Sequence, residues 1–287
     1  MNGIKIKLPV AVTDTSLPKL YDDPILNVGS LFLFDPSHSL GESGTTIVNT
    51  GAANNIAWNL ANETMGTSVA ESSLKGVISL NNVGLSKAII EMTSKKGVHG
   101  IISKVNTTYP VNWTMSLPDA IKTHLLTNWA SRKFFISVWG RVTRISDTST
   151  SGFMLLANKS STTSNLKSLF QANSIVGNYF GIRNPTGMNV LGNFIRNVET
   201  GNSMGVTPAN IAGMDALLKI GPGNAYAASE AGKSQSMIIY RVYIEDLAVS
   251  GRTYAQVDAI DIALYNAAFA TGGKYDADTF TAVSTLL

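Results

Sequence analysis

Two pairs of carboxylates lie near the C-terminal end of the sequence and could supply a general acid and a general base. Glu245 and Asp246 are adjacent, whereas Asp258 and Asp261 are three residues apart. Hydrolysis of a glycosidic bond needs two carboxyl groups that face one cleft. Adjacent residues of a strand point to opposite faces, so we expect Glu245 on a solvated strand face and Asp246 in the following turn. We expect Asp258 and Asp261 on the solvated side of a helix.

The remaining residue types that perform catalysis or bind metals do not form a recognisable motif. His38, His99 and His124 are far apart in the sequence, which excludes the close spacing of zinc-binding histidines. Aspartates at residues 21–24 and 276–280 could offer oxygens to calcium, but aspartate in such places is commonly a turn residue. There is no cysteine. We therefore assign no catalytic residue, no metal ligand and no cofactor, and expect a protein that is not an enzyme.

Aromatic residues outside the apolar runs could bind a carbohydrate or another protein. Trp58, Trp113 and Trp129 lie in or beside polar stretches, where an exposed indole could stack on a sugar ring. The alternative for each is a side chain that caps the core or fills a subunit interface. Arg241 and Tyr243 are the best candidates for an interface, because arginine and tyrosine are frequent anchors of protein–protein contacts.

The elements that must position these residues follow from the spacing of apolar side chains. Residues 237–247 alternate with period two, which predicts a strand with Ile238, Tyr240, Val242 and Ile244 on one face. Its other face, which includes Arg241, Tyr243 and Glu245, is expected to be polar and solvated. Apolar residues then recur every three or four positions from residue 257 onward, which predicts an amphipathic helix. A capping box of Thr253 and Gln256 begins that helix.

Further elements are predicted upstream. Residues 116–129 have the spacing of a helix, with Pro118 in its first turn. Residues 134–145 alternate, with Phe134, Ile136, Val138 and Val142 on one face and Phe135, Ser137, Trp139 and Arg141 on the other. Short apolar runs separated by Asn, Gly, Ser and Thr follow over residues 152–195, and this pattern favours a β-sandwich.

The composition restricts the class of protein. The 287 residues are 44% hydrophobic and 14% charged, with a net charge of +3 and no long run of like charges, so we expect no nucleic-acid partner. No segment reaches the roughly 18 apolar residues of a spanning helix, and the N-terminus has too short an apolar stretch for a signal peptide. We expect no membrane insertion. Residues 1–30, with three prolines, are predicted to be an extended arm, and residues 31–287 one domain.

The order of several segments resembles a known fold family. The segments FFISVWGRVTRI and IIYRVYIEDLAVSGRTYAQVDAI are similar to two strands of the concanavalin-like, laminin-G-type jelly roll. The residues that carry the similarity are Phe135, Ile136, Ser137 and Trp139 in the first segment and Val242, Tyr243, Leu247, Ser250 and Val257 in the second. The resemblance implies an all-β, concanavalin-like jelly-roll sandwich with an N-terminal arm and a C-terminal helix.

A second resemblance concerns the amino-acid composition and one short stretch of the sequence. The stretch GSLFLFDPSHSL, the absence of cysteine and the high content of Asn, Thr, Gly and Ala are similar to bacteriophage virion proteins that carry such a jelly roll. This resemblance implies a virion structural protein of a tail, baseplate or capsid-decorating position, assembled in the host cytoplasm. Its partners would be other copies of itself and other virion proteins. The alternative is a carbohydrate-binding adhesin module of a tail fibre or spike, with a host surface glycan as ligand.

Overall fold

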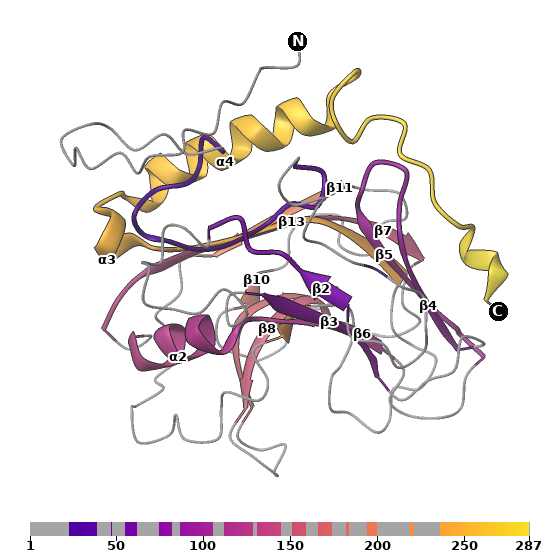
Figure 1. The fold of residues 1–287 in the computed structure, drawn as a ribbon, viewed down its shortest axis with the longest axis horizontal. Helices are drawn as coiled ribbons and strands as arrows, with labels where there is room; N and C mark the ends of the chain where they lie inside the picture. Colours follow the sequence, from indigo (N-terminus) through magenta and orange to yellow (C-terminus); the bar gives the residue numbers. More distant parts are fainter. Residues whose placement is uncertain are drawn as a thin grey trace, which may run out of the picture.

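Figure 1 shows the computed structural model. It describes residues 23–38, 47, 55–61, 75–81, 87–105, 112–128, 131–144 and 236–286, together with the backbone of five strands between residues 151 and 220. These five strands are β8 (Ser151–Asn158), β9 (Leu166–Asn173), β10 (Ile182–Arg183), β11 (Phe194–Glu199) and β12 (Lys219–Ile220).

The largest sheet has six strands: β1 (Ser30–Phe34), β4 (Ala88–Met92), β5 (Val98–Ile102), β7 (Phe134–Arg144), β11 and β13 (Ser236–Asp246). The order is β11-β7-β13-β5-β4, and β1 also pairs with β13. All of these pairings are antiparallel. β13 is therefore the central strand, with β7 along one side and both β5 and β1 along the other.

A second sheet of four strands faces the first. It has the order β12-β6-β3-β2, with β2 at Asn55–Ala57, β3 at Gly76–Asn81 and β6 at Asn112–Ser116. A third, three-stranded sheet has the order β10-β9-β8. The expectation of a mostly β protein with a few helices is confirmed.

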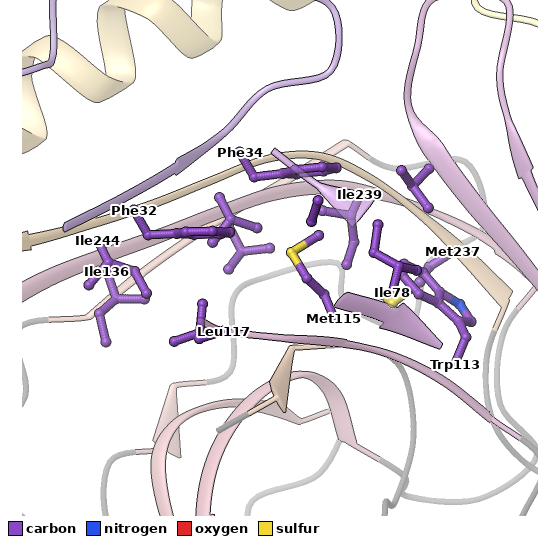
Figure 2. Close-up of a cluster of buried hydrophobic side chains, with 14 of the residues drawn as sticks. Phe32, Phe34, Ile78, Trp113, Met115, Leu117, Ile136, Met237, Ile239 and Ile244 are labelled. Carbon is purple, nitrogen blue, oxygen red and sulfur yellow. The ribbon is translucent and has the colours of Figure 1, made fainter. Parts of the chain in front are cut away.

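The main hydrophobic core fills the space between the six-stranded and the four-stranded sheet. Figure 2 shows Phe32, Phe34 and Ile239 of the larger sheet meeting Met115 and Trp113 of the smaller one. The two sheets approach closely at Gly100 of β5, where an added Cβ would lie 1.7 Å from Trp113 Nε1. Only glycine leaves room for the indole there, because any side chain would occupy the same space.

Both faces of β7 are buried. Phe134, Ile136, Val138 and Val142 join the main core, as their alternation predicts. Phe135 and Trp139 on the opposite face are also buried, in two smaller clusters. A C-terminal helix covers this opposite face.

That helix is α4 (Tyr254–Phe269), which follows the short α3 (Leu247–Ser250) and runs along the outer face of the six-stranded sheet (Figure 1). The Thr253–Gln256 capping box is confirmed. Val257, Ile260 and Leu264 pack toward the sheet, on residues that include Phe135 and Tyr243. The helix α2 (Asp119–Asn128) is also confirmed, with Ile121 and Leu125 in the main core. A 3₁₀ turn, η5 (Val283–Thr285), lies near the C-terminus.

A β-bulge in β13 changes which residues face the core. The pairing of β13 with β7 shifts register between Ile239 and Arg241. As a result Met237, Ile239, Val242 and Ile244 point into the main core, whereas Ile238 and Tyr240 belong to a cluster under α4. The predicted face of Ile238, Tyr240, Val242 and Ile244 is therefore wrong, because strict alternation does not account for the extra residue of a bulge.

Part of the predicted N-terminal arm lies outside the described residues, which begin at Asp23. Ile25 and Leu26 are buried in the cluster that also holds Leu247 and Val257. The end of this segment is thus fixed against the C-terminal helices.

Candidate functional site

The outer face of the six-stranded sheet carries a cluster of four charged side chains below α4. Arg241 of β13 donates to Asp23 through both terminal nitrogens, each at 2.9 Å, and to Asp35 at 2.7 Å. Lys274 donates to Asp35 at 2.6 Å from the loop that follows α4. Arg241, Asp23 and Asp35 are buried, and the Lys274 side chain is 39% exposed.

This cluster holds two cations and two anions, and the attraction between them offsets the free-energy cost of burying charge. The guanidinium of Arg241 also lies 4.9 Å from the centre of the Trp139 ring, in a cation–π contact. Burial raises the pKa of Asp35, but the charges of Arg241 and Lys274 outweigh burial and lower that pKa to about 2. Burial lowers the pKa of Arg241, but the charges of Asp23 and Asp35 raise it further above its ordinary value. Asp35 and Arg241 are therefore charged at neutral pH.

A cavity of about 280 Å³ adjoins the charged cluster. Its walls combine the apolar side chains of α4 with the charged cluster, and the lining residues are Asp23, Trp139, Arg241, Leu264, Ala267, Ala268 and Lys274. Such a cavity could hold a small polar molecule that has one apolar face, because hydroxyl groups can bond both a carboxylate and an ammonium.

A second ionic group lies at the end of β13 near the start of α4. Arg252 donates to both carboxylate oxygens of Glu245, through Nε at 2.9 Å and through Nη2. Tyr243 donates to Glu245 at 2.6 Å and is hydrogen-bonded to Ser30 at 2.7 Å. Burial and the charge of Glu245 raise the pKa of the Tyr243 hydroxyl well above its ordinary value. Glu245 is buried, so its expected place on a solvated strand face is wrong.

Asp246 serves as the N-cap of α3. Its Oδ1 accepts from the backbone N–H groups of Ala248 and Val249, at 3.0 and 3.3 Å. Its Oδ2 accepts from His124 and Arg132, each at 2.8 Å. Burial raises the pKa of Asp246, but these hydrogen bonds lower it further than burial raises it. The expected turn former is therefore a buried anion that joins α2, α3 and β13.

Asp261 is also buried, against the expectation that it faces solvent. It accepts from the Ser137 hydroxyl at 2.8 Å and from the Trp139 indole N–H at 3.3 Å. It thus ties α4 to β7. Asp258 is partly exposed, so the two residues do not face one cleft.

The residues proposed from the sequence as interface anchors do not reach the surface. Arg241 is 2% exposed and Tyr243 is fully buried, because α4 and residues 23–35 cover the face that they occupy. Neither can contact another protein directly, so the expected interface at these two residues is wrong. They belong to neighbouring ionic groups on the same face of the sheet.

The tryptophans proposed to stack on a glycan differ in how far the structure exposes them. Trp113 is fully buried in the main core and cannot contact a ligand. Trp58 is partly exposed, and the ammonium of Lys75 lies 4.8 Å from its ring centre. Trp129 lies outside the described residues. Of the two described candidates, only Trp58 is therefore partly accessible. Trp139 is 1% exposed and packed in the core, and it also lines the cavity.

The most exposed residues of α4 form an outward face without charge, which the partly exposed Asp258 borders. Its residues are small or uncharged: Ala255, Gln256, Ala259, Ile262, Ala263, Asn266 and Ala267. Four of the alanines recur every four residues, so they form one ridge along the helix, whose last member, Ala267, also lines the cavity.

Comparison with protein-family models, with curated proteins and with solved structures finds no match for this chain. No group of three or more acidic or histidine side chains that could hold a metal ion occurs among the described residues. Within the same part of the chain, no helix has the length and apolar character needed to cross a membrane.

Sequence reasoning missed three members of the charged cluster: Asp23, Asp35 and Lys274. One signal could have revealed them. An arginine inside an otherwise apolar strand must find carboxylates if the strand is covered on both faces, and two aspartates near prolines precede and follow β1.

Proposed function

We propose that the protein is a non-enzymatic structural component of a bacteriophage virion, in a tail, baseplate or capsid-decorating position. It acts by assembling with itself and with other virion proteins. The observation that supports this proposal best is the uncharged outward face of α4, which is exposed along the whole helix.

The chemistry of that face suits contact with protein better than contact with water. Exposed helices of monomeric proteins commonly carry charged residues on their outward side. Here alanines at residues 255, 259, 263 and 267 leave a smooth ridge that lets a second helix approach closely. Ile262, which is 44% exposed, adds an apolar side chain beside the ridge.

We also propose the jelly-roll connectivity of the concanavalin-like family for the β domain. Two facing sheets around one core support it, as does the position of the similar segments. The first segment falls on β7 and the second on β13, α3 and the start of α4. These segments lie side by side at the centre of the six-stranded sheet.

The assembly role is tested by the mass of the full chain in solution, measured by light scattering over a range of concentrations. We expect an oligomer, and we expect Ala263→Glu to reduce it to the monomer, because the charge would be buried without a partner. The matched control is Ala248→Glu, an exposed alanine outside α4. A monomeric wild-type chain at high concentration would overturn the proposal, as would an Ala263→Glu variant that keeps the wild-type mass.

A second candidate function is glycan binding, as the adhesin module of a tail fibre or spike. The observation that favours it is the cavity, where Asp23 and Lys274 could bond sugar hydroxyls beside the Trp139 indole. A glycan array followed by titration of the captured sugars tests it. Ala267→Trp, which fills the cavity, should abolish binding, whereas Ala263→Trp on the same helix should not. Equal binding by both variants would exclude this cavity as the glycan site.

A further inference from the structure

The C-terminal segment, residues 278–286, contacts the edge of the six-stranded sheet mainly through polar contacts. Asp278 accepts from Ser94 Oγ at 3.1 Å and from the Lys95 backbone N–H at 2.8 Å. The backbone of Thr279 exchanges two further hydrogen bonds with Ser94, at 3.0 and 2.9 Å. All of these partners belong to the turn between β4 and β5.

The next residues of the segment continue along the same edge. Thr281 donates to Glu91 of β4 through its backbone N–H at 2.8 Å and through its hydroxyl at 2.6 Å. The guanidinium of Arg144 in β7 donates to the carbonyls of Val283 and Leu286. The segment thus crosses from the β4–β5 edge toward β7, which β13 separates from β5. We call the surface that it covers the receiving edge.

One aromatic side chain anchors the segment. The Phe280 ring lies 4.9 Å from the His99 imidazole, edge to face, and 5.4 Å from the Arg141 guanidinium. His99 is fully buried and is held by hydrogen bonds to Glu91 at 2.8 Å and to Thr143 at 2.9 Å. Phe280 therefore docks on a preformed surface whose side chains are fixed by their own neighbours.

Backbone strain is concentrated where the segment meets this edge. Among the described residues, the non-glycine residues with positive φ are Ala277, at 53°, and Lys96, at 69°. Ala277 immediately precedes the segment, and Lys96 lies in the β4–β5 turn that receives it. Residues held in this region persist only where the surrounding contacts impose it, and such strain often marks a segment that has two arrangements.

We propose that residues 278–286 are an exchangeable arm, which docks on the β4–β5 edge of a second copy of this chain as well as on its own. The same hydrogen bonds form in either case, because every copy presents the same receiving edge. The strained Ala277, directly before the arm, offers a place where the chain can redirect it. This inference deepens the proposed assembly role and rests on it.

The test uses the absence of cysteine from the sequence. Ser94 and Thr279 are exposed neighbours at the junction. Ser94→Cys replaces a hydroxyl that contacts Asp278 and Thr279 with a thiol, so the double variant serves as the control that the arm still docks. Chains with only Ser94→Cys and chains with only Thr279→Cys are unfolded, mixed in equal amounts, refolded and mildly oxidised. A short tag on one variant identifies the mixed dimer on a non-reducing gel. If all arms are exchanged in dimers, about half of the chains should become cross-linked, since half of random pairs are mixed.

The controls distinguish cross-links that come from exchanged arms from cross-links that come from random collisions between chains. They also distinguish arm exchange from oligomerisation by other contacts. The double variant Ser94→Cys/Thr279→Cys shows whether the two thiols can bond. Chains with only Ala248→Cys, an exposed site away from the arm, should give no cross-link with the Ser94→Cys chains. The inference is overturned if the double variant closes within one chain and the mixture gives no mixed dimer. An oligomer in light scattering together with that result would leave the assembly role standing without the arm.

Discussion

The two faces of the six-stranded sheet are both buried, but by opposite means. The inner face meets the second sheet through hydrocarbon side chains, from Phe32 to Ile244 (Figure 2). The outer face presents Arg241 and Glu245, each buried only because it has partners of opposite charge in residues 23–35 or in the loop before α4. The inner face needs only volume and shape from its neighbours, whereas the outer face needs particular charges at particular distances.

The largest effect is expected from breaking the outer face at its centre. Arg241→Met should lower the free energy of unfolding by about 3–5 kcal/mol, because Asp23 and Asp35 would lie buried next to each other with only one partly exposed cation. Urea denaturation at pH 7 measures this loss. Lys274→Met is the matched control, and should cost less because that side chain is 39% exposed. A loss below 1 kcal/mol for Arg241→Met would show that the cluster does not hold the outer face.

A substitution on the inner face should lower the free energy of unfolding by a similar amount, but this loss should not depend on pH. Ile239→Ala leaves a cavity between the two sheets and should cost about 3 kcal/mol. No ionisable group is involved, so the difference from wild type should stay constant between pH 7 and pH 4. A difference that changes with pH would contradict the division between the two faces.

Lowering the pH should remove stabilisation from the ionic contacts of the outer face but not from the hydrocarbon contacts of the inner face. The pKa of Asp35 is lowered to about 2 in the folded chain from an ordinary 3.8, so its stabilisation is present above pH 3.8 and is lost as the pH falls toward 2. The loss amounts to about 2 kcal/mol. Stability measured at several pH values should fall less steeply over this range in Asp35→Asn than in wild type. Equal slopes would count against a lowered pKa at Asp35.

The smallest effect is expected at the start of the helix that covers the outer face. Thr253→Ala removes the capping hydrogen bond to the Gln256 backbone and should cost about 1 kcal/mol. Thr253→Ser retains the hydroxyl and is the control. Thermal unfolding measures both, and equal losses would show that the hydroxyl is not the stabilising group.

The sequence was sufficient to predict elements that depend on local spacing. Alternation correctly divided the residues of β7 between two faces, and the Thr253–Gln256 spacing correctly placed the start of α4. The bulge in β13 could not be predicted in this way, because its extra residue is set by pairing with β7.

The candidate site was predictable only in part, because polarity was equated with solvent exposure. Arg241 was singled out, but as a surface interface residue, and its partners Asp23 and Asp35 lie 218 and 206 residues away in the chain. No spacing rule connects residues at such separations. The burial of Glu245 and Asp261 depends in the same way on how α4 folds back over the sheet, which is a tertiary property.

The central position of β13 has a consequence for the order of folding. Every other strand of the six-stranded sheet precedes β13 in the chain, yet β1, β5 and β7 all form hydrogen bonds with it. As the chain leaves the ribosome, these strands lack their shared neighbour until residues 236–246 emerge. The sheet therefore closes late, and the earlier strands must avoid pairing with other nascent chains in the meantime.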